Sequence, residues 1–250
     1  TLPNKAVLLS SNKVNNVIND FFDDKSSNKI KKKFGNFDLI YAANVFNHID
    51  DPYEFLKNCK SVIKKKGIII LEFPDLDQLF KKISFDTIYH EHRNYYSKRS
   101  LVNVLKKINL KIVKFENLEY MSGSLRVYLI NQNFTKVDYT KFKKFNLRLF
   151  NKFIKKSIYI RKYLKKFVNK YKNKNLVGVG AATKGNTLLN YCGFNFDQIN
   201  CILEKSKHKI GKFTPSSAIP IVSENKIVKT DAIIFLPWNI NSFLKKKFLS

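Results

Sequence analysis

Two apolar runs separated by a helix-length segment constrain the fold of this chain more than any other feature. Residues 37–46 (FDLIYAANVF) and 67–73 (GIIILEF) are almost wholly apolar. Residues 52–66 between them carry apolar side chains at helical spacing, namely Phe55, Leu56, Cys59, Val62 and Ile63. Strand, helix and strand of this kind predict a parallel sheet covered on both faces. Two further β-rich runs, 111–120 and 125–131, are expected to close this half around a Ser-Gly-Ser turn.

The second half of the chain shows the same alternation. Its strand-like runs are 175–180 (NLVGVG), 199–204 (INCILE) and 231–236 (DAIIFL). Residues 138–172 carry aromatic and aliphatic side chains between lysines, which favours a long connecting helix over a nucleic-acid or membrane helix. We therefore expect an α/β chain in three parts: a first domain (1–131), a helical connector (132–174) and a second domain (175–250).

The composition supports folded domains and leaves the meaning of the charge open. Of the 250 residues, 44% are hydrophobic, enough for a sizeable core. The 47 Lys and Arg against 19 Asp and Glu give a net charge of +28. The excess is almost all Lys and accompanies abundant Asn, Ile and Phe, which favours compositional drift in an A/T-rich genome over a selected polyanion site. We expect no specific nucleic-acid partner, and polyanion binding is the alternative.

Cysteine usage and hydropathy indicate an intracellular protein. The three cysteines, Cys59, Cys192 and Cys201, lie far apart without a CxxC pair. This spacing predicts buried, reduced thiols rather than disulfides or a zinc site. No apolar run approaches the ~18 residues of a membrane span, and no leader segment opens the chain. We expect a soluble, cytoplasmic protein without a membrane partner.

The densest polar cluster is residues 88–97 (IYHEHRNYYS), with two histidines, a glutamate and three tyrosines. Such groups are costly to bury without partners, so their crowding between apolar segments predicts a functional site. His90 and His92 are spaced poorly for one metal ion, and no HExxH follows, so metal binding is the weaker alternative. A histidine whose tautomer is fixed by a neighbouring glutamate predicts a general base near neutral pH.

A second polar group follows the first predicted strand. Asn44 and His48 lie at the carboxyl end of the 37–46 run, where open α/β sheets bind their ligands. His48 has an equally good structural interpretation, as a loop histidine satisfied by Asp50 or Asp51 at a helix start.

Residues 177–193 (VGVGAATKGNTLLNYCG) form a glycine-rich turn between a predicted strand and helix. Backbone amides and a helix N-terminus in such a turn can bind a phosphate or pyrophosphate. The spacing of Gly178, Gly180 and Gly185 is not GxGxxG, and Asn186 stands where a nucleoside triphosphatase would have lysine.

Two charged residues could complete a nucleotide site around this turn. Lys184 can meet an anion. Glu204 ends the next predicted strand at a distance typical of ribose recognition, although an exposed strand-end carboxylate explains it equally well.

In the stretches that carry these residues, the chain resembles the nucleotide-sugar C-methyltransferases. The matching stretches run in order over nearly the whole chain: FDLIYAANVFNHIDD, LEFPDLDQLFKKISFDTIYHEHRNYYS, SGSLRVYL, VGVGAATKGNTLLNYCG and IIFLPWN. The family combines an S-adenosylmethionine domain with a C-terminal Rossmann-like domain. It methylates the ring carbon beside a keto group in a sugar joined to a nucleoside diphosphate. The resemblance implies a partial methyltransferase domain over residues 1–131 and a substrate-binding domain over 175–250.

The resemblance also implies roles for the polar residues. A carbon acid beside a ketone must lose a proton before it attacks a methyl group. By resemblance, His92 is the base, with Tyr89 and Glu91 beside it, and Asn44 and His48 supply hydrogen bonds to the sugar or enolate.

The C-terminal domain of this family helps to hold the nucleotide sugar. The resemblance therefore makes the glycine-rich turn a candidate for the diphosphate. The candidate substrate-binding residues are Gly180, Lys184, Gly185, Asn186 and Glu204.

The chain departs from the family pattern at its beginning. Family members carry an N-terminal four-cysteine zinc module and then a glycine-rich cofactor turn, and neither is present in this sequence. An acidic residue and a proline usual in the family align with Leu2 and Pro3, so Thr1 is expected to mark a truncation.

The remaining candidates for binding S-adenosylmethionine are Asp20, Phe21, Ala43 and Asn44. We expect them to bind this cofactor weakly. The alternative function is therefore a catalytically inactive sugar-nucleotide binding module.

Overall fold

The computed structural model describes residues 16–120, 123–133, 142, 144–226, 230–237 and 246. Leu2, Pro3, Trp238 and Asn239 lie outside these ranges. The chain divides into two compact units, and each is described by itself. Unit 1 comprises Thr1–Leu76 and Arg93–Lys144, and unit 2 comprises Asp77–His92 and Phe145–Ser250.

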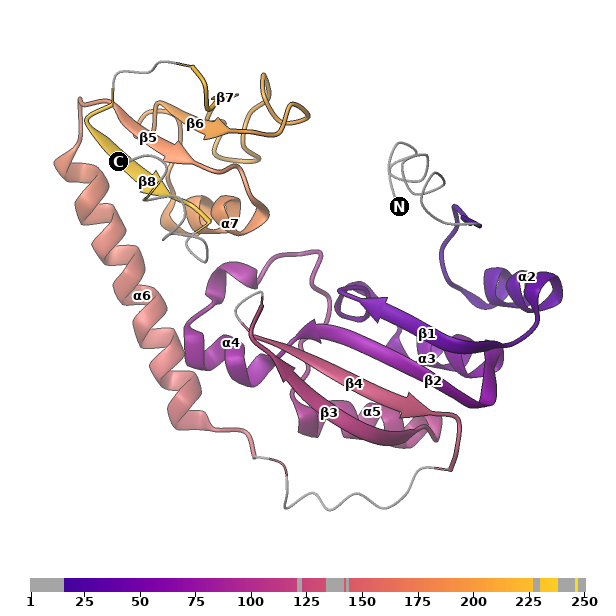
Figure 1. Cartoon of the computed structure of the whole chain (residues 1–250). Coiled ribbons are helices and arrows are strands. Elements are labelled where there is room, and N and C mark those ends of the chain that lie inside the picture. Colours follow the sequence, from indigo (N-terminus) through magenta and orange to yellow (C-terminus); the bar gives the residue numbers. More distant parts are fainter. Residues whose placement is uncertain are drawn as a thin grey trace. The chain divides into compact units, whose positions relative to one another are not determined.

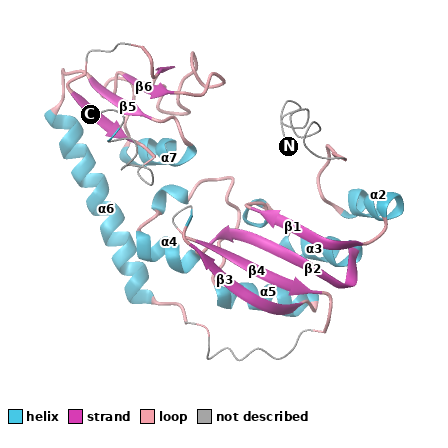
Figure 2. Ribbon diagram, viewed as in Figure 1, coloured by secondary structure: helices cyan, strands magenta, loops and turns pink. Residues whose placement is uncertain are grey.

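Unit 1 is a four-stranded sheet with helices packed on it (Figures 1 and 2). Its helices are α2 (Asp24–Phe34), η1 (Phe46–His48), α3 (Pro52–Val62) and α5 (Lys98–Ile108). Its strands are β1 (Phe37–Ala43), β2 (Ile63–Pro74), β3 (Lys111–Leu118) and β4 (Ser124–Ile130). The order is β1-β2-β4-β3, with β1 parallel to β2 and the β3–β4 hairpin antiparallel. The predicted strand–helix–strand unit and closing hairpin are both confirmed.

Local sequence fixes where the helices of unit 1 begin. The Asp51 carboxylate accepts hydrogen bonds from the backbone of Tyr53 and Glu54, and Pro52 occupies the first turn of α3. Ser97 and Ser100 form a reciprocal capping box at the start of α5. These caps determine the residues at which the two helices begin.

The core of unit 1 lies on one face of its sheet. Ile69, Leu71 and Phe73 of β2 are buried there with apolar side chains from α3 and α5. The opposite face carries Leu39 and Tyr41, which are 55% and 56% exposed. The expectation of a sheet covered on both faces is therefore wrong for unit 1 as far as the described residues extend, because α3 and α5 pack on the same face (Figure 1).

A buried carboxylate lies on the otherwise exposed face. Glu72 of β2 is 2% exposed and accepts hydrogen bonds from the hydroxyls of Tyr41 and Tyr120 and from the Arg126 guanidinium. Arg126 also contacts Glu116 at 3.2 Å. Burial alone would raise the pKa of Glu72, but the hydrogen bonds from these partners and the charge of Arg126 lower it overall.

Unit 2 contains a fully parallel sheet of four short strands in the order β7-β6-β5-β8. They are β5 (Leu176–Val179), β6 (Cys201–Glu204), β7 (Ile221–Ser223) and β8 (Ala232–Phe235). Its helices are α4 (Leu76–Lys82), which begins at the unit boundary, η2 (Phe85–Thr87), α6 (Leu147–Lys170) and α7 (Thr183–Cys192). The predicted parallel α/β organisation of this half is confirmed.

The long helix α6 begins later than the sequence predicts. The Asn146 side chain accepts a hydrogen bond from the backbone of Leu149 and so caps the helix at Leu147. Residues 144–146 are not helical, and residues 138–141 lie outside the described ranges. Phe153 and Val168 of α6 are buried, whereas its lysines are exposed.

The cysteines are free and buried, as predicted. Burial raises the pKa of the Cys59 thiol to about 12 and that of Cys192 to about 11. These thiols are therefore poor nucleophiles. None of the helices in the described part of the chain is long and apolar enough to cross a membrane.

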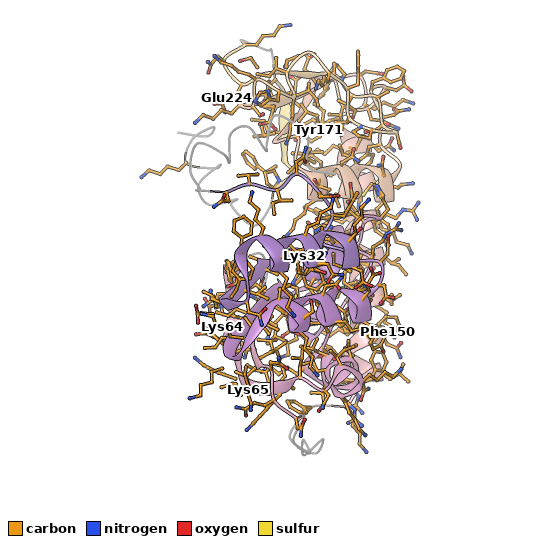
Figure 3. The ribbon with its side chains drawn as sticks, turned by 90° about the vertical axis from the view of Figure 1, so that its right-hand side faces the viewer. Lys32, Lys64, Lys65, Phe150, Tyr171 and Glu224 are labelled. Atoms are coloured by element: carbon orange, nitrogen blue, oxygen red, sulfur yellow. The ribbon has the colours of Figure 1, made fainter. Side chains whose placement is uncertain are left out.

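Exposed lysines occur on separate elements of unit 1. Lys32 on α2 and Lys64 and Lys65 on β2 project outward (Figure 3). Lys64 pairs with the exposed Asp38 at 2.8 Å. The expectation that the lysines form solvated faces stays a prediction.

We predict that Glu72→Gln lowers the free energy of unfolding by about 1.5–3 kcal/mol at pH 7, because hydrogen bonds to a buried charge are lost. The folded-state pKa of Glu72 is lowered, so its charged form stabilises the fold above its ordinary pKa. That contribution disappears as the pH falls through the folded-state pKa. Urea unfolding from pH 7 to pH 3 should therefore show the wild type and variant converging. Asp38→Asn, at an exposed ion pair, is the control and should cost less than about 1 kcal/mol.

Candidate functional site

The Tyr89–His92 segment is fixed by the residues just before it. Phe85 of η2 packs on the core of unit 2, and its ring centroid lies 5.0 Å from that of Tyr191 on α7. The segment consequently belongs to unit 2. The sequence analysis placed it in the first domain because nothing in the local pattern indicates which core Phe85 joins.

Tyr89 and His92 form a hydrogen-bonded pair. The Tyr89 hydroxyl lies 2.8 Å from His92 Nε2, and the ring centroids are 4.1 Å apart. Glu91 is not the partner that orients His92. Its carboxylate lies 3.3 Å from Nδ1 of the exposed His90. The expected Glu–His pair therefore forms with the other histidine, and a tyrosine contacts His92.

Tyr89 remains a neutral phenol in this pair. Burial raises its pKa, and the negative charges of Glu91 and Asp86 raise it further. A protonated hydroxyl can donate to a neutral imidazole or accept from a protonated one. The pair can therefore hold a proton at either of two atoms that are 2.8 Å apart.

The glycine-rich turn joins β5 to α7 as predicted. Gly180 has φ +86°, a left-handed conformation, and a Cβ on it would meet Pro237 at 2.7 Å. A Cβ on Gly185 would meet Leu236 at 2.6 Å. Ala182 stands at the N-cap of α7 and gives no side-chain cap, so the first turn of α7 is open to another hydrogen-bond acceptor.

Glu204 holds this turn in place. One oxygen of its carboxylate accepts a hydrogen bond from the Ala181 amide at 2.8 Å, and the other accepts from the amides of Lys205 and Ser206. Burial raises the pKa of Glu204, but these amides and Lys209 lower it overall. Lys209 donates to the Ala181 carbonyl at 2.7 Å. These contacts give Glu204 a structural role, and its predicted contact with ribose stays a prediction.

A cavity of about 630 Å³ in unit 2 brings the two predicted motifs together. Residues 88–91 line it with the turn residues 181–183 and with Asn186 and Tyr191 of α7. The loop after β6 adds a set that the sequence analysis missed: His208, Lys209, Lys212, Phe213, Thr214 and Pro215. No spacing or periodicity marked these loop residues as part of a site.

Lys184 is not among the described residues that line this cavity. Burial lowers its pKa, and the opposing influence is the negative charge of Asp86. The predicted contact of Lys184 with a phosphate stays a prediction.

The remaining predicted residues belong to unit 1. Asn44 follows β1 directly, has φ +53°, and its amide donates to the Glu72 carbonyl at 2.8 Å. Ala43 is half-buried and His48 is exposed. That Asn44 and His48 join His92 in one site stays a prediction.

A buried amide in the same loop escaped the sequence analysis. Asn47 is 2% exposed, and neither polar atom of its side chain has a hydrogen-bond partner among the described residues. A buried amide without partners is costly, so this loop has hydrogen-bonding capacity for a bound group.

Asp20 and Phe21 lie before α2. The Asp20 carboxylate accepts a hydrogen bond from the Phe21 amide at 2.9 Å, and the Phe21 ring is 65% exposed. The ring is therefore accessible for contact with an aromatic ligand.

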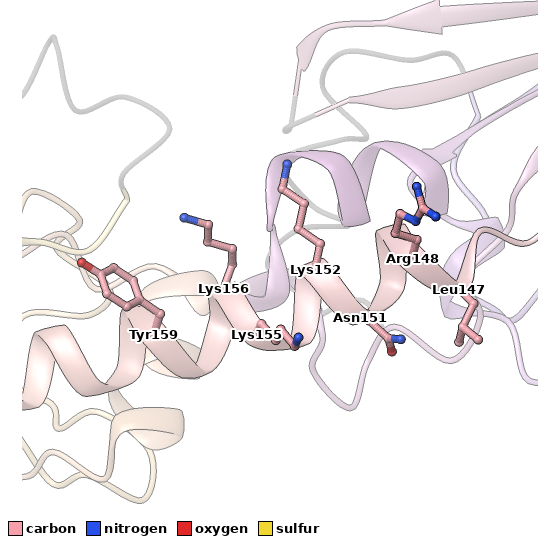
Figure 4. Close-up of a pocket in the computed structure, with 7 residues that line it drawn as sticks. All are labelled: Leu147, Arg148, Asn151, Lys152, Lys155, Lys156 and Tyr159. Atoms are coloured by element: carbon pink, nitrogen blue, oxygen red, sulfur yellow. The ribbon is translucent and has the colours of Figure 1, made fainter.

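A second cavity, of about 710 Å³, lies along α6 (Figure 4). Arg148, Lys152 and Lys156 point to the same side of the helix, and the exposed Tyr159 follows them. This row is the structural feature that a polyanion would meet.

Comparison with known proteins gives two family matches. Residues 122–248, half of the chain, match the model of the C-methyltransferase C-terminal domain, and residues 3–114 match a methyltransferase domain. The C-methyltransferase NovU of Streptomyces niveus is 27% identical over 241 residues, which are 87% of this chain and 55% of that protein. The chain thus spans about half the length of this curated relative.

Solved structures show weaker similarity. Magnesium protoporphyrin IX methyltransferase of Synechocystis PCC 6803 with bound SAH is 12% identical, with a TM-score of 0.31 over 39% of this chain and 46% of that chain. An S-adenosylmethionine-dependent methyltransferase of Clostridium acetobutylicum is 13% identical, with a TM-score of 0.32 over 39% and 59%.

We predict that Glu204→Ala speeds hydrogen exchange at the Ala181 and Ser206 amides and destabilises unit 2 by about 1–3 kcal/mol, because partly buried donors lose their acceptor. Exchange measured by NMR would detect both effects. Asp197→Ala removes an exposed carboxylate elsewhere in unit 2 and should leave these amides unchanged. Unaltered exchange in Glu204→Ala would contradict the proposed structural role.

We predict weak DNA binding that is indifferent to sequence and is lost at moderate salt, because dispersed lysines provide only counterion release. Fluorescence anisotropy at 50 and 200 mM salt would measure this. Lys152→Glu with Lys156→Glu should weaken binding no more than Lys64→Glu with Lys65→Glu. A salt-resistant complex that depends on the α6 pair would instead make α6 a polyanion site.

Proposed function

The chain belongs to the family defined by the C-methyltransferase C-terminal domain, and from this premise we propose that it acts in S-adenosylmethionine-dependent C-methylation of a nucleoside-diphosphate keto-sugar. The observation that carries the proposal is the cavity that joins the Tyr89 segment to the glycine-rich turn. The name of NovU, a C-methyltransferase, supports the reaction class.

The loop after β1 offers groups that fit the cofactor. We propose that Ala43 and Asn44 contact it, with Asp20 and the exposed Phe21 ring beside the adenine. The buried Asn47 amide, which lacks a protein partner, adds unused donors and acceptors to this loop. S-adenosylmethionine supplies the electrophilic methyl group when bound.

We assign removal of the ring proton to the Tyr89–His92 pair. Tyr89 lines the cavity, and its hydroxyl contacts His92 Nε2. The Tyr89 oxygen takes the ring proton as its own hydroxyl proton passes to His92, the final proton acceptor, and the electron pair of the broken C–H bond remains on the sugar as an enolate. Glu91 lines the cavity together with Tyr89 and is the acidic residue of this segment.

Hydrogen-bond donors must then stabilise the enolate oxygen. We propose Asn44 and His48 for this role, since both follow β1 at its carboxyl end. Such donors act mainly in the transition state, where negative charge accumulates on oxygen.

We propose that the diphosphate binds at the open first turn of α7. The left-handed Gly180 and the tightly packed Gly185 set the path of this turn, and Asn186 lines the cavity beside it. The Glu204 carboxylate holds the turn in place by accepting a hydrogen bond from the Ala181 amide. We propose Lys184, in the first turn of α7, as a further contact to the diphosphate.

We predict that His92→Ala abolishes exchange of the ring proton of the keto-sugar with solvent deuterium, because the proton acceptor is lost. Affinity for the nucleotide sugar should stay within about twofold, since a base contributes little to ground-state binding. NMR in deuterium oxide and calorimetry would measure the two quantities. Added imidazole should partly restore exchange in His92→Ala.

Tyr89→Phe should slow the exchange of the ring proton. The matched control is Tyr163→Phe, which changes an exposed tyrosine on α6 and should leave the exchange rate unchanged. If the wild type binds the nucleotide sugar but never exchanges its ring proton, the chain acts as a binding module. Loss of binding with normal exchange in His92→Ala would remove His92 from the base role.

A further inference from the structure

The loop between β6 and β7 presents an exposed aromatic ring to the cavity of unit 2. Phe213 is 65% exposed and lines the cavity. Its neighbours Thr214 and Ser217 are 4% and 2% exposed, so the loop itself is well packed. An accessible phenylalanine on a packed loop at a cavity wall is a feature of ligand sites.

Hydrogen bonds hold this loop in one conformation. The Thr214 and Ser217 hydroxyls are 2.6 Å apart, and the Ile219 amide donates to Thr214 Oγ1 at 2.9 Å. The Gly211 amide donates to the Ile221 carbonyl, and the Ile221 amide donates to the Lys212 carbonyl. The backbone that carries Lys212 and Phe213 is therefore set before any ligand binds.

The same loop gives the cavity its positive charge. Lys209 and Lys212 line it together with His208, and Glu91 is the sole acid among the described residues of the lining. The Lys209 ammonium already contacts the Ala181 carbonyl and lies 3.9 Å from Glu204. Lys212 has no carboxylate within 4.0 Å among the described residues, so its charge is available to an anionic ligand.

We propose that the loop from Lys212 to Pro215 is the nucleotide-recognition element of this cavity. The Phe213 ring stacks on the base, and the Lys212 ammonium binds the diphosphate beside the open turn of α7. An aromatic ring, a cation and a helix N-terminus without a side-chain cap, all at one cavity, match a nucleoside diphosphate better than an uncharged sugar. The inference rests on the proposed function, because it assigns the nucleotide part of that substrate.

The test compares a nucleoside diphosphate with inorganic pyrophosphate, so that base and phosphate contacts are separated. Calorimetry on the full chain would use uridine diphosphate, thymidine diphosphate and pyrophosphate at fixed salt. Each nucleotide should bind the wild type about tenfold or more tightly than pyrophosphate. Phe213→Leu should abolish this difference, and Phe213→Tyr should preserve it. Lys212→Met should weaken all three ligands about tenfold.

Matched variants control for general effects. Phe196→Leu changes another exposed phenylalanine of unit 2, 57% exposed, that is absent from the described lining of the cavity. Lys207→Met removes an exposed lysine from the same loop. Both should bind all three ligands like the wild type.

The inference and the proposed reaction can fail separately. Nucleotide binding that depends on Phe213, without any proton exchange or methylation, would support the recognition element and contradict the reaction. Methylation whose KM is unchanged in Phe213→Leu and Lys212→Met would support the reaction and overturn the recognition element. Equal affinity of the wild type for pyrophosphate and both nucleotides, or no binding of any of them, would also overturn it.

Discussion

The packing of Phe85 onto unit 2 determines where the reactive side chains of this protein lie. Because the Phe85 ring packs against Tyr191 of α7, the four residues Tyr89–His92, which follow closely in the chain, must also lie near α7. A polar segment that would be expensive to bury is thus placed at a cavity wall, where its groups can meet a ligand.

The same unit lines the rest of that cavity with residues from the glycine-rich turn and from the loop after β6. Glu204 and Lys209 are occupied with the backbone of the glycine-rich turn, whereas Lys212 and Phe213 are carried by a loop that is bonded within itself. Lys209 thus both holds the backbone of the turn and lines the cavity, whereas Lys212 and Phe213 line the cavity from a loop with its own hydrogen bonds. These hydrogen bonds set the shape of the wall before a ligand binds, so less ordering entropy opposes binding.

The sequence predicted those features that depend on local patterns. Apolar runs identified strands β1, β2, β5, β6 and β8, and the crowding of Tyr89, Glu91 and His92 pointed to a segment of which residues 88–91 line a cavity. It misplaced the start of α6, because the Asn146 cap outweighs the apolar periodicity that continues before it. It missed Glu72, whose burial depends on partners 31 to 54 residues away, and Phe213, which belongs to no periodic element. Side-chain partners, such as Tyr89 for His92, require the tertiary structure.

The identity of the His92 partner changes the electrostatics of proton transfer. A histidine paired with a carboxylate takes up a proton beside a charge that is already negative, whereas Tyr89 is kept neutral by burial and by nearby acids. Proton transfer to the Tyr89–His92 pair would therefore create a new positive charge and leave a new negative charge on the enolate. Two charges that arise together in a partly buried site attract each other more strongly than they would in water. Because Tyr89 stays neutral, its hydroxyl adds no charge that would compete with the enolate for the imidazolium, and the attraction between these two new charges offsets part of the cost of forming them.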